Sequence, residues 1–324
     1  MKRPILYVLA GLALGLTACS SDDEQAQSQE MPIRLSASVN EQLTRANQGV
    51  QNQNTIFQID AQVNIYISEN FAPSQVNSAS SYAKNGYVFQ VQDANGTLMP
   101  ASSLSYPYYP TNGNSVKIVG MYPKSTLKNV TKSTTSFTIE TDQSTDLNYC
   151  LSDLMYSDNL TEAAKQPTPQ QMTFVHKLSK ININLIPASG LTQDIFTQAK
   201  VTLLNVVKKI NFNGTNGTVS ELSETEQAAN RSNVLVTNDG YYNSCAIIVP
   251  QTVSAGNFIQ IRMKAGGDLL DYSLPSDLTF EEGKAYTFNI TVKQDAIVVG
   301  SYTITDWVEG INKTVPHTDT QFMD

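Results

Sequence analysis

Alternating apolar and polar residues recur along most of the chain, in short runs separated by turn-forming residues. In the run from 178 to 185, for example, Ile181, Ile183 and Leu185 share one face and polar residues share the other. A period of two is typical of a half-buried β-strand, because successive side chains point to opposite faces of a sheet. Runs of this kind lie at 33–39, 57–67, 87–91, 116–122, 136–140, 178–185, 201–207, 245–249, 258–264, 286–292 and 297–305. The pattern predicts an all-β protein.

Turn signals divide these strands into two groups. Asp93-Ala94-Asn95-Gly96 indicates a hairpin, because Asn-Gly tolerates positive φ, and a polar stretch around Pro167 and Pro169 suggests a linker near residue 170. Many short strands with few helices favour sandwiches over βαβ units. We therefore predict two tandem β-sandwich domains, transthyretin-like with Greek-key topology, at 46–170 and 171–310, with a tail at 311–324. Brief helical spacing occurs only at 160–165, 191–198 and 221–229.

The first 18 residues have the layout of a secretory signal peptide. Met1-Lys2-Arg3 is basic, and the apolar run from Ile5 to Leu16 is too short to span a bilayer as a folded helix. The run ends in Leu16-Thr17-Ala18-Cys19, which resembles a bacterial lipobox, where the peptidase cuts before the cysteine and the thiol carries the lipid. We therefore expect Cys19 to carry the lipid anchor of an exported precursor. The polar, acidic stretch at 20–30 is a tether, and it resembles a surface-export signal of Bacteroidetes lipoproteins.

A short predicted strand follows the tether and leads into a segment without apolar pattern. Arg45 and Ala46 lie in that segment, and the loop at 47–54 is polar. A strand that fits a sheet is thus joined to the rest of the chain by an exposed, cleavable connection. Residues 19–45 thus comprise the lipidated tether and this strand, and Arg45 is the lone arginine that follows it; the simplest interpretation of Arg45 is an ordinary loop residue. The inward residues of this strand are Ile33, Leu35, Ala37 and Val39.

Composition excludes some functions and leaves the cysteines open. The chain has 324 residues, enough for two domains. Its net charge of -8 and pI of about 4.8 provide no basic patch for nucleic acid. Besides Cys19, the chain contains Cys150 and Cys245. An oxidising envelope permits a disulfide between them, but we favour buried free thiols, which behave as small hydrophobic side chains.

No constellation of catalytic residues is apparent in the sequence. His176 starts a strand among apolar residues and is interpreted as structural, and His317 lies in the polar tail. Zinc-ligand spacing, a phosphate-binding glycine loop and a Gly-x-Ser-x-Gly elbow are all missing. A glycosidase would need two carboxylates brought together in space. The carboxylates available near the C-terminus are Glu281, Glu282, Asp306 and Glu309. We predict that the protein is not an enzyme and uses no metal or cofactor.

Six stretches between about residues 30 and 310 occur together, in this order, in a known family. They are Tyr108–Gly113 with Val116–Pro123, Asp153–Tyr156, Phe174–Lys180, Ile248–Thr252, Gly283–Phe288 and Ile304–Trp307. These stretches resemble the Bacteroidetes fimbrillins, the type V pilins. The resemblance implies an exported lipoprotein of the outer membrane that is cut after Arg45, so that residues 19–45, the lipidated tether and removable strand, are released and Ala46 becomes the first residue. It also implies a fimbrium at the cell surface, with no cofactor.

Removal of the first strand has a physical consequence that agrees with this resemblance. A sheet that loses a strand exposes unpaired backbone groups and an apolar groove, which both favour capture of another strand. If a like or related fimbrial subunit supplies that strand, the contact is head-to-tail and does not close, so a filament grows. Like and related subunits are therefore the expected partners.

The tail and an aromatic cluster leave alternatives open. Residues 308–324 alternate only faintly, and Pro316 would interrupt a donor strand. Stalk, tip and uncut anchor positions therefore stay open, with stalk or tip favoured. The alternative class is a surface lipoprotein that binds glycans or host protein through Tyr106, Tyr108 and Tyr109, since tyrosines offer flat apolar faces with a polar tip. The competing interpretation places these tyrosines in the core.

Overall fold

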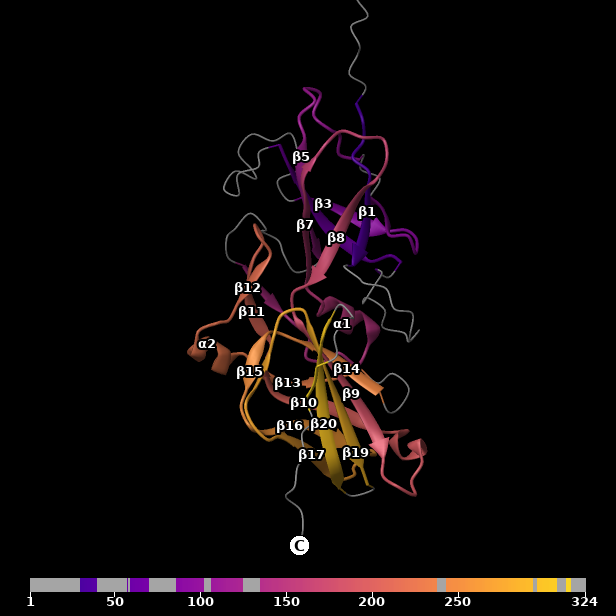
Figure 1. The fold of residues 1–324 in the computed structure, drawn as a ribbon, viewed down its shortest axis with the longest axis vertical. Helices are drawn as coiled ribbons and strands as arrows, with labels where there is room; N and C mark the ends of the chain where they lie inside the picture. Colours follow the sequence, from indigo (N-terminus) through magenta and orange to yellow (C-terminus); the bar gives the residue numbers. More distant parts are fainter. Residues whose placement is uncertain are drawn as a thin grey trace, which may run out of the picture.

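The computed structural model describes residues 30–39, 57, 59–69, 86–101, 106–124, 135–237, 243–293, 296–307 and 313–315. Strands dominate this part of the chain, and Figure 1 shows them in two groups along the long axis of the molecule. The described helices are α1 (Asp146–Leu151), α2 (Glu224–Ala229) and the 3-10 helix η2 (Gln193–Phe196). The prediction of an all-β protein is confirmed.

The upper group in Figure 1 is a seven-stranded sheet that closes on itself as a barrel, in the order β1-β4-β3-β2-β5-β7-β8. Alternate residues point inward, so that Val63 and Ile65 on β2 are fully buried. The strand β1 closes the barrel between β4 and β8. The strands are β1 (Leu35–Val39), β2 (Gln62–Ser68), β3 (Tyr87–Val91), β4 (Thr97–Pro100), β5 (Val116–Tyr122), β7 (Met155–Ala163) and β8 (Gln170–His176).

The lower group contains a five-stranded sheet in the order β14-β9-β19-β20-β21 and a four-stranded sheet in the order β13-β10-β16-β17. Two smaller sheets, β12-β11-β6 and β15-β18, complete it. Its strands are β6 (Thr135–Thr138), β9 (Ser179–Pro187), β10 (Lys200–Val207), β11 (Lys209–Asn213), β12 (Thr218–Ser220), β13 (Arg231–Leu235), β14 (Asn243–Ile248), β15 (Gln251–Val253), β16 (Gly256–Arg262), β17 (Leu269–Leu274), β18 (Leu278–Phe280), β19 (Lys284–Val292), β20 (Ile297–Asp306) and β21 (Lys313–Val315).

The change from one group to the other differs from the predicted boundary near residue 170. The strand β8 begins at Gln170 and pairs with β1 and β7, so the chain leaves the barrel only between β8 and β9. The helical turn expected at 160–165 is wrong, since β7 runs through Ala163. In the other direction, β6 lies before β7 in the chain but pairs with β11. The strand β6, which lies within the first predicted domain, therefore belongs to the lower group of strands.

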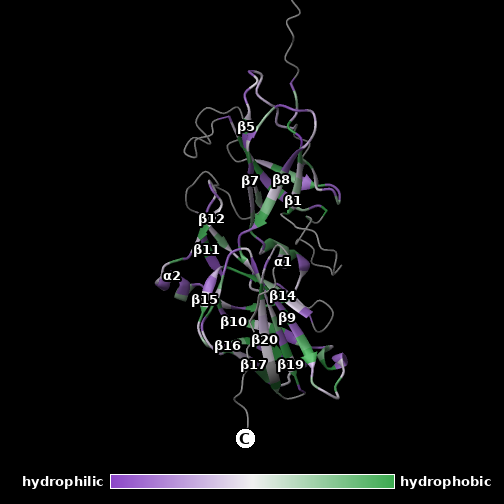
Figure 2. Cartoon of the chain, in the orientation of Figure 1, coloured by the Kyte–Doolittle hydropathy of each residue, from purple (hydrophilic) through white to green (hydrophobic). Residues whose placement is uncertain are grey.

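The two groups share one continuous apolar core. Buried residues of the barrel and of the lower sheets belong to a single cluster, and Figure 2 shows apolar residues gathered on the strands while α2 is mostly hydrophilic. Tyr156 of β7 packs edge-on against Phe212 of β11, with ring centroids 6.0 Å apart. Such a shared core resists separation of the groups, because opening it would expose apolar surface to water.

Candidate functional site

The strand β1 lies where the removable strand was predicted, and its alternate side chains point into the barrel. The exposed fractions are 0% for Ile33, 1% for Leu35, 5% for Ala37 and 3% for Val39. Arg34 between them is exposed. The alternation read from the sequence is therefore the actual inward face of this strand.

One edge of β1 pairs with the last strand of the barrel. The ladder with β8 is parallel and runs from Leu35 opposite Gln170 to Val39 opposite Phe174. The Gln170 amide donates to the Arg34 carbonyl at 2.9 Å, and the Ser38 hydroxyl accepts from the Gln171 amide group at 3.1 Å. These five register pairs join residues more than 130 positions apart in the chain.

The other edge of β1 pairs with two separate segments. Leu35 lies opposite Leu98 in an antiparallel ladder with β4, and the Ala37 amide donates to the Gly96 carbonyl at 2.8 Å. Further toward the N-terminus, the Ile33 amide donates to Pro107 at 2.7 Å, and the Tyr109 amide donates to Met31 at 2.9 Å. Without β1, the barrel would therefore have two unpaired edges around an apolar slot.

The tip of the hairpin formed by β3 and β4 packs against β1. The Asp93 carboxylate accepts from the amides of Asn95 at 2.9 Å and Thr97 at 3.0 Å, and these bonds lower the pKa of Asp93, chiefly through Thr97. Gly96 follows with φ of +74°, and a Cβ atom there would lie 1.9 Å from the Ala37 carbonyl oxygen. The hairpin predicted at this turn is confirmed, and its glycine permits the close approach to β1.

The predicted lipid and processing residues, Cys19, Arg45 and Ala46, lie outside the described residues. The chain is described again at Phe57, which is 2% exposed. The Phe57 ring packs edge-on against Phe174 of β8 at 4.9 Å and against Tyr122 at 5.4 Å between centroids. A buried aromatic residue thus lies on the retained side of the predicted cut, next to the end of β1.

The three tyrosines of the alternative binding surface do not share one exposed face. Tyr109 is 3% exposed, and its hydroxyl accepts from the Gln170 side chain at 3.0 Å. Burial raises the pKa of Tyr109 above its usual value. Tyr106 packs against Phe89 at 6.2 Å between centroids, and Tyr108 is 39% exposed. Two of the three tyrosines therefore support the barrel and the 107–109 segment that pairs with β1.

His176 is buried at the point where the chain leaves the barrel. Its Nδ1 atom lies 2.8 Å from Asp153 Oδ1, and its ring stacks on Trp307 with centroids 3.9 Å apart. His176 at the end of β8 thus contacts Asp153, which follows α1, and Trp307, which follows β20. These contacts agree with a structural role for the histidine. Two of the carboxylates considered for catalysis form ion pairs instead, Glu282 with Lys177 and Asp306 with Lys284. His317 and Glu309 lie outside the described residues.

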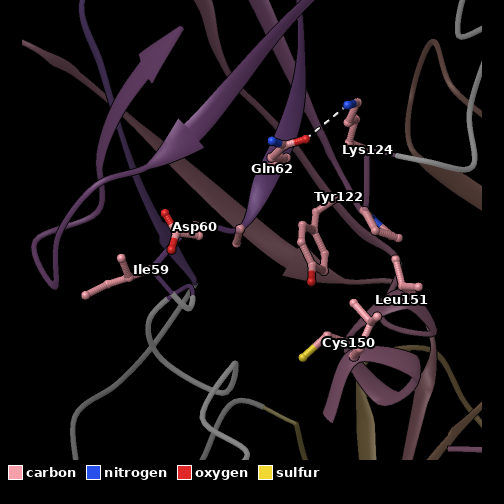
Figure 3. A pocket seen from close by; sticks show the side chains of 10 residues that line it. Ile59, Asp60, Gln62, Tyr122, Lys124, Cys150 and Leu151 are labelled. Carbon is pink, nitrogen blue, oxygen red and sulfur yellow. Dashed lines mark hydrogen bonds between the residues drawn. The ribbon is translucent and has the colours of Figure 1, made fainter. Parts of the chain in front are cut away.

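A hollow of about 450 Å³ lies where β2 and β5 meet α1 (Figure 3). Two exposed apolar residues, Ile59 and Leu147, lie at its wall. The polar groups at its rim already have partners: Lys124 donates to Gln62 at 3.0 Å, as drawn in Figure 3, and Asp60 accepts from Gln90 at 2.6 Å. The hollow therefore offers apolar surface rather than a set of converging catalytic groups.

Cys150 and Cys245 are both buried thiols that form no disulfide with each other, as the favoured interpretation predicted. Among the described residues, no cluster of three histidine, cysteine or carboxylate side chains is arranged to hold a metal ion. Within the same residues, none of the helices has the length and apolar character needed to cross a membrane.

Sequence reasoning missed the partners of β1. The alternation of Met172, Phe174 and His176 marks β8 as an inward-facing strand, and this signal was available in the sequence. The contacts made by Gly96 and by the 107–109 segment carry no such signal, because they depend on the fold bringing distant residues together.

Comparison with known proteins gives a family. The profile of the fimbrillin-like family matches residues 44–307. None of the curated proteins matches this chain. Among solved structures, a candidate cell adhesion protein from Bacteroides ovatus is 18% identical, with a TM-score of 0.63 and coverage of 87% of this chain and 99% of that one. A candidate cell adhesion protein from Bacteroides uniformis is 16% identical, with a TM-score of 0.61 and coverage of 86% and 98%.

These structural likenesses, at such low identity, concern the fold alone. The tip fimbrial protein Mfa3 from Porphyromonas gingivalis is 12% identical, with a TM-score of 0.44 and coverage of 85% of this chain and 100% of that one. The family match, by contrast, extends over most of the chain, from the segment with the predicted cut to the buried Trp307. The chain therefore belongs to the fimbrillin-like family.

Proposed function

We propose that this chain is a structural and adhesive fimbrial subunit, exported as a lipoprotein and activated by removal of β1. Family membership supports the fimbrial role and a place on the cell surface. The single observation that carries the activation step is the position of β1, which closes the barrel by pairing with β8 on one edge and β4 on the other. In this proposal Cys19 holds the precursor at the outer membrane, and cleavage between Arg45 and Ala46 releases it.

The energetics of β1 support exchange of one strand for another. Burial of Ile33, Leu35 and Val39 contributes on the order of 5–9 kcal/mol, at roughly 1.5–3 kcal/mol for each side chain. Main-chain hydrogen bonds with Gln170, Gly96 and Pro107 add to this. Loss of β1 leaves that groove exposed, so a strand from another subunit restores the same contacts.

Head-to-tail insertion of that strand builds a filament. When the donor strand and the groove lie on different surfaces of a subunit, the contact does not close on itself. In this chain, β21 (Lys313–Val315) pairs with β20 of its own five-stranded sheet, and Pro316 follows. The subunit accepts a strand at the barrel in either a stalk or a tip position.

The second candidate is an uncut surface lipoprotein that acts as a fimbrial anchor or as a module that binds glycans or host protein. A chain with β1 retained is fully paired around the barrel, which favours an anchor if Arg45 is never cut. The observation that favours a binding module is the partial exposure of Tyr108. Glycan-array binding that is lost on substitution of Tyr106 and Tyr108 would favour the module.

The deciding experiment is the N-terminal residue and intact mass of protein sheared from cells. We expect a start at Ala46 without lipid. A start at acylated Cys19 would contradict the processing step and favour the anchor. In the same assay, Arg45→Ala is expected to leave a lipidated precursor that does not polymerise, whereas normal polymer from this variant would overturn the cleavage mechanism.

A further inference from the structure

We propose that the groove left by β1 selects its replacement strand by side-chain size, and that it requires a small residue at the position of Ala37. This inference rests on the strand exchange proposed above. The inward residues of β1 run large, large, small and medium, in the order Ile33, Leu35, Ala37 and Val39. The small third residue is not a weak point in the strand; the surrounding barrel leaves no room for a larger one.

The interior next to Ala37 is filled from one wall to the other. Met172 and Phe174, the β8 residues beside Ala37 and Val39, are fully buried. Both side chains reach across the barrel to Gly120 of β5, where an added Cβ atom would lie 2.5 Å from Phe174 Cζ and 2.7 Å from Met172 Cε. Met172 therefore cannot withdraw to make space, because the opposite backbone already blocks it.

The backbone at Ala37 cannot move outward either. Its amide is bonded to the Gly96 carbonyl at 2.8 Å, and its own carbonyl oxygen lies where a side chain on Gly96 would have to be. On the opposite edge, Ala37 is in register with Met172 in the parallel ladder. A donor residue at this position is thus fixed between the hairpin tip and β8. The donor strand therefore fits only in a register that places a small residue there.

The requirement also identifies the kind of donor. No register of residues 308–324 places two large apolar residues, a small residue and a third apolar residue at alternate positions. The nearest register, from Ile311 to His317, sets Lys313 at the position of Leu35, where a charge would be buried without a partner. The occupant we infer is a strand of a different fimbrial subunit that carries the large-large-small-medium pattern.

The experiment uses the full chain, cut at Arg45 by an arginine-specific protease, with intact mass showing that Arg34 is uncut. Fluorescent peptides of residues 30–39 are added in excess, and their exchange into the groove is followed by anisotropy. The test peptide carries Ala37→Leu. The matched control carries Ser36→Leu, which adds a leucine on the half-buried outer face of the same strand. A peptide of residues 309–318 tests the tail.

We expect the native and Ser36→Leu peptides to bind within about twofold of each other and Ala37→Leu to bind at least about tenfold more weakly, as overpacking of a full core predicts. The tail peptide is expected not to bind. Equal binding of the Ala37→Leu and native peptides would overturn the size requirement while leaving strand exchange intact, and strong binding of the tail peptide would overturn the assignment of the donor. If no peptide exchanges, strand exchange itself fails, and this inference fails with it.

Discussion

Gly96 is the residue whose substitution should most directly disturb the closure of the barrel. Its φ of +74° and its contact with Ala37 both exclude a side chain. Gly113 has a similar φ of +81°, but a Cβ atom added there would meet nothing within 4 Å. Gly113→Ala should therefore cost only about 1–2 kcal/mol for the backbone conformation, whereas Gly96→Ala should cost at least ~3 kcal/mol because the clash adds to it.

Thermal unfolding of the two variants measures this difference. Because Gly96 lies against β1, Gly96→Ala should also speed release of the β1 fragment after a cut at Arg45. Equal destabilisation by the two substitutions would show that the contact between Gly96 and Ala37 contributes nothing beyond the turn.

The Cys150 thiol provides a second test at this scale. Burial, followed by the negative charge of Asp153, raises the pKa of Cys150 from 9.0 to about 12. The folded state therefore keeps the proton that the unfolded chain loses near pH 9. The contribution of this group to stability is fully present below pH 9 and is lost as the pH rises from 9 toward 12.

Alkylation measures the reactivity of this thiol, because the thiolate is the reactive form. At pH 8 we expect iodoacetamide to modify Cys150 in denaturant but hardly at all in the folded protein, as read by peptide mass spectrometry. Rapid labelling of the folded chain at pH 8 would contradict the burial of the thiol.

Features of single residues could be predicted from the sequence where they depend only on neighbouring positions in the chain. The inward set of β1 followed from its own alternation, and the turn before Gly96 followed from Asn-Gly. The role of Gly96 against Ala37 was not predictable, since the two residues are 59 positions apart and a glycine in a hairpin already has a sufficient local reason. Size selection at Ala37 likewise depends on Gly120, Met172 and Phe174, which no local pattern connects.

At the scale of elements, the segment from β6 to α1 joins the barrel to the lower sheets. Its central residue is Gln143, which is fully buried. The Gln143 side chain donates to the Ile247 carbonyl and accepts from the Ile247 amide, both at 2.8 Å. Ile247 belongs to β14, at the edge of the five-stranded sheet. One glutamine thus pairs both backbone groups of Ile247, on an edge strand that has no further neighbour in the sheet.

Gln143→Leu should destabilise the protein by about 2–4 kcal/mol, because two buried backbone groups of Ile247 lose their partners. The matched control is Gln198→Leu, at an exposed position, which should change stability by less than about 0.5 kcal/mol. Denaturant unfolding measures both. A similar small effect at both positions would indicate that water replaces the glutamine side chain. The segment from β6 to α1 would then contribute little to holding the barrel and the lower sheets together.

The elements were easier to predict than their partners. Most strands were found from period-two runs, but the boundary predicted near residue 170 does not coincide with the change from the barrel to the lower sheets, because two prolines before β8 gave a stronger local signal than the pairing of β8 with β1. The pairing of β6 with β11 was missed for a related reason: a local pattern defines a strand but does not say which sheet it joins. The predicted lipid and processing residues stay predictions.

At the scale of the whole molecule, the fold separates the barrel, which the proposed removal of β1 would open, from the lower sheets, which it would leave in place. The barrel is closed by a strand near the N-terminus, whereas β9 and β19 of the lower sheet pair with each other through eight register positions without involving β1. Processing should therefore open one end of the molecule and leave the other in place. Such a division suits a subunit that must stay folded while its binding groove is empty.

Hydrogen exchange tests this division. After a cut at Arg45 and removal of the released fragment, the amides of Gln170 and Tyr109 lose their acceptors in the released segment, so they should exchange at least about tenfold faster. Amides of β9 and β19 should keep their protection. Adding the peptide of residues 30–39 should restore the slow exchange at both Gln170 and Tyr109. Faster exchange throughout the chain would mean instead that the barrel and the lower sheets unfold together, and that an emptied groove cannot persist long enough to capture a strand.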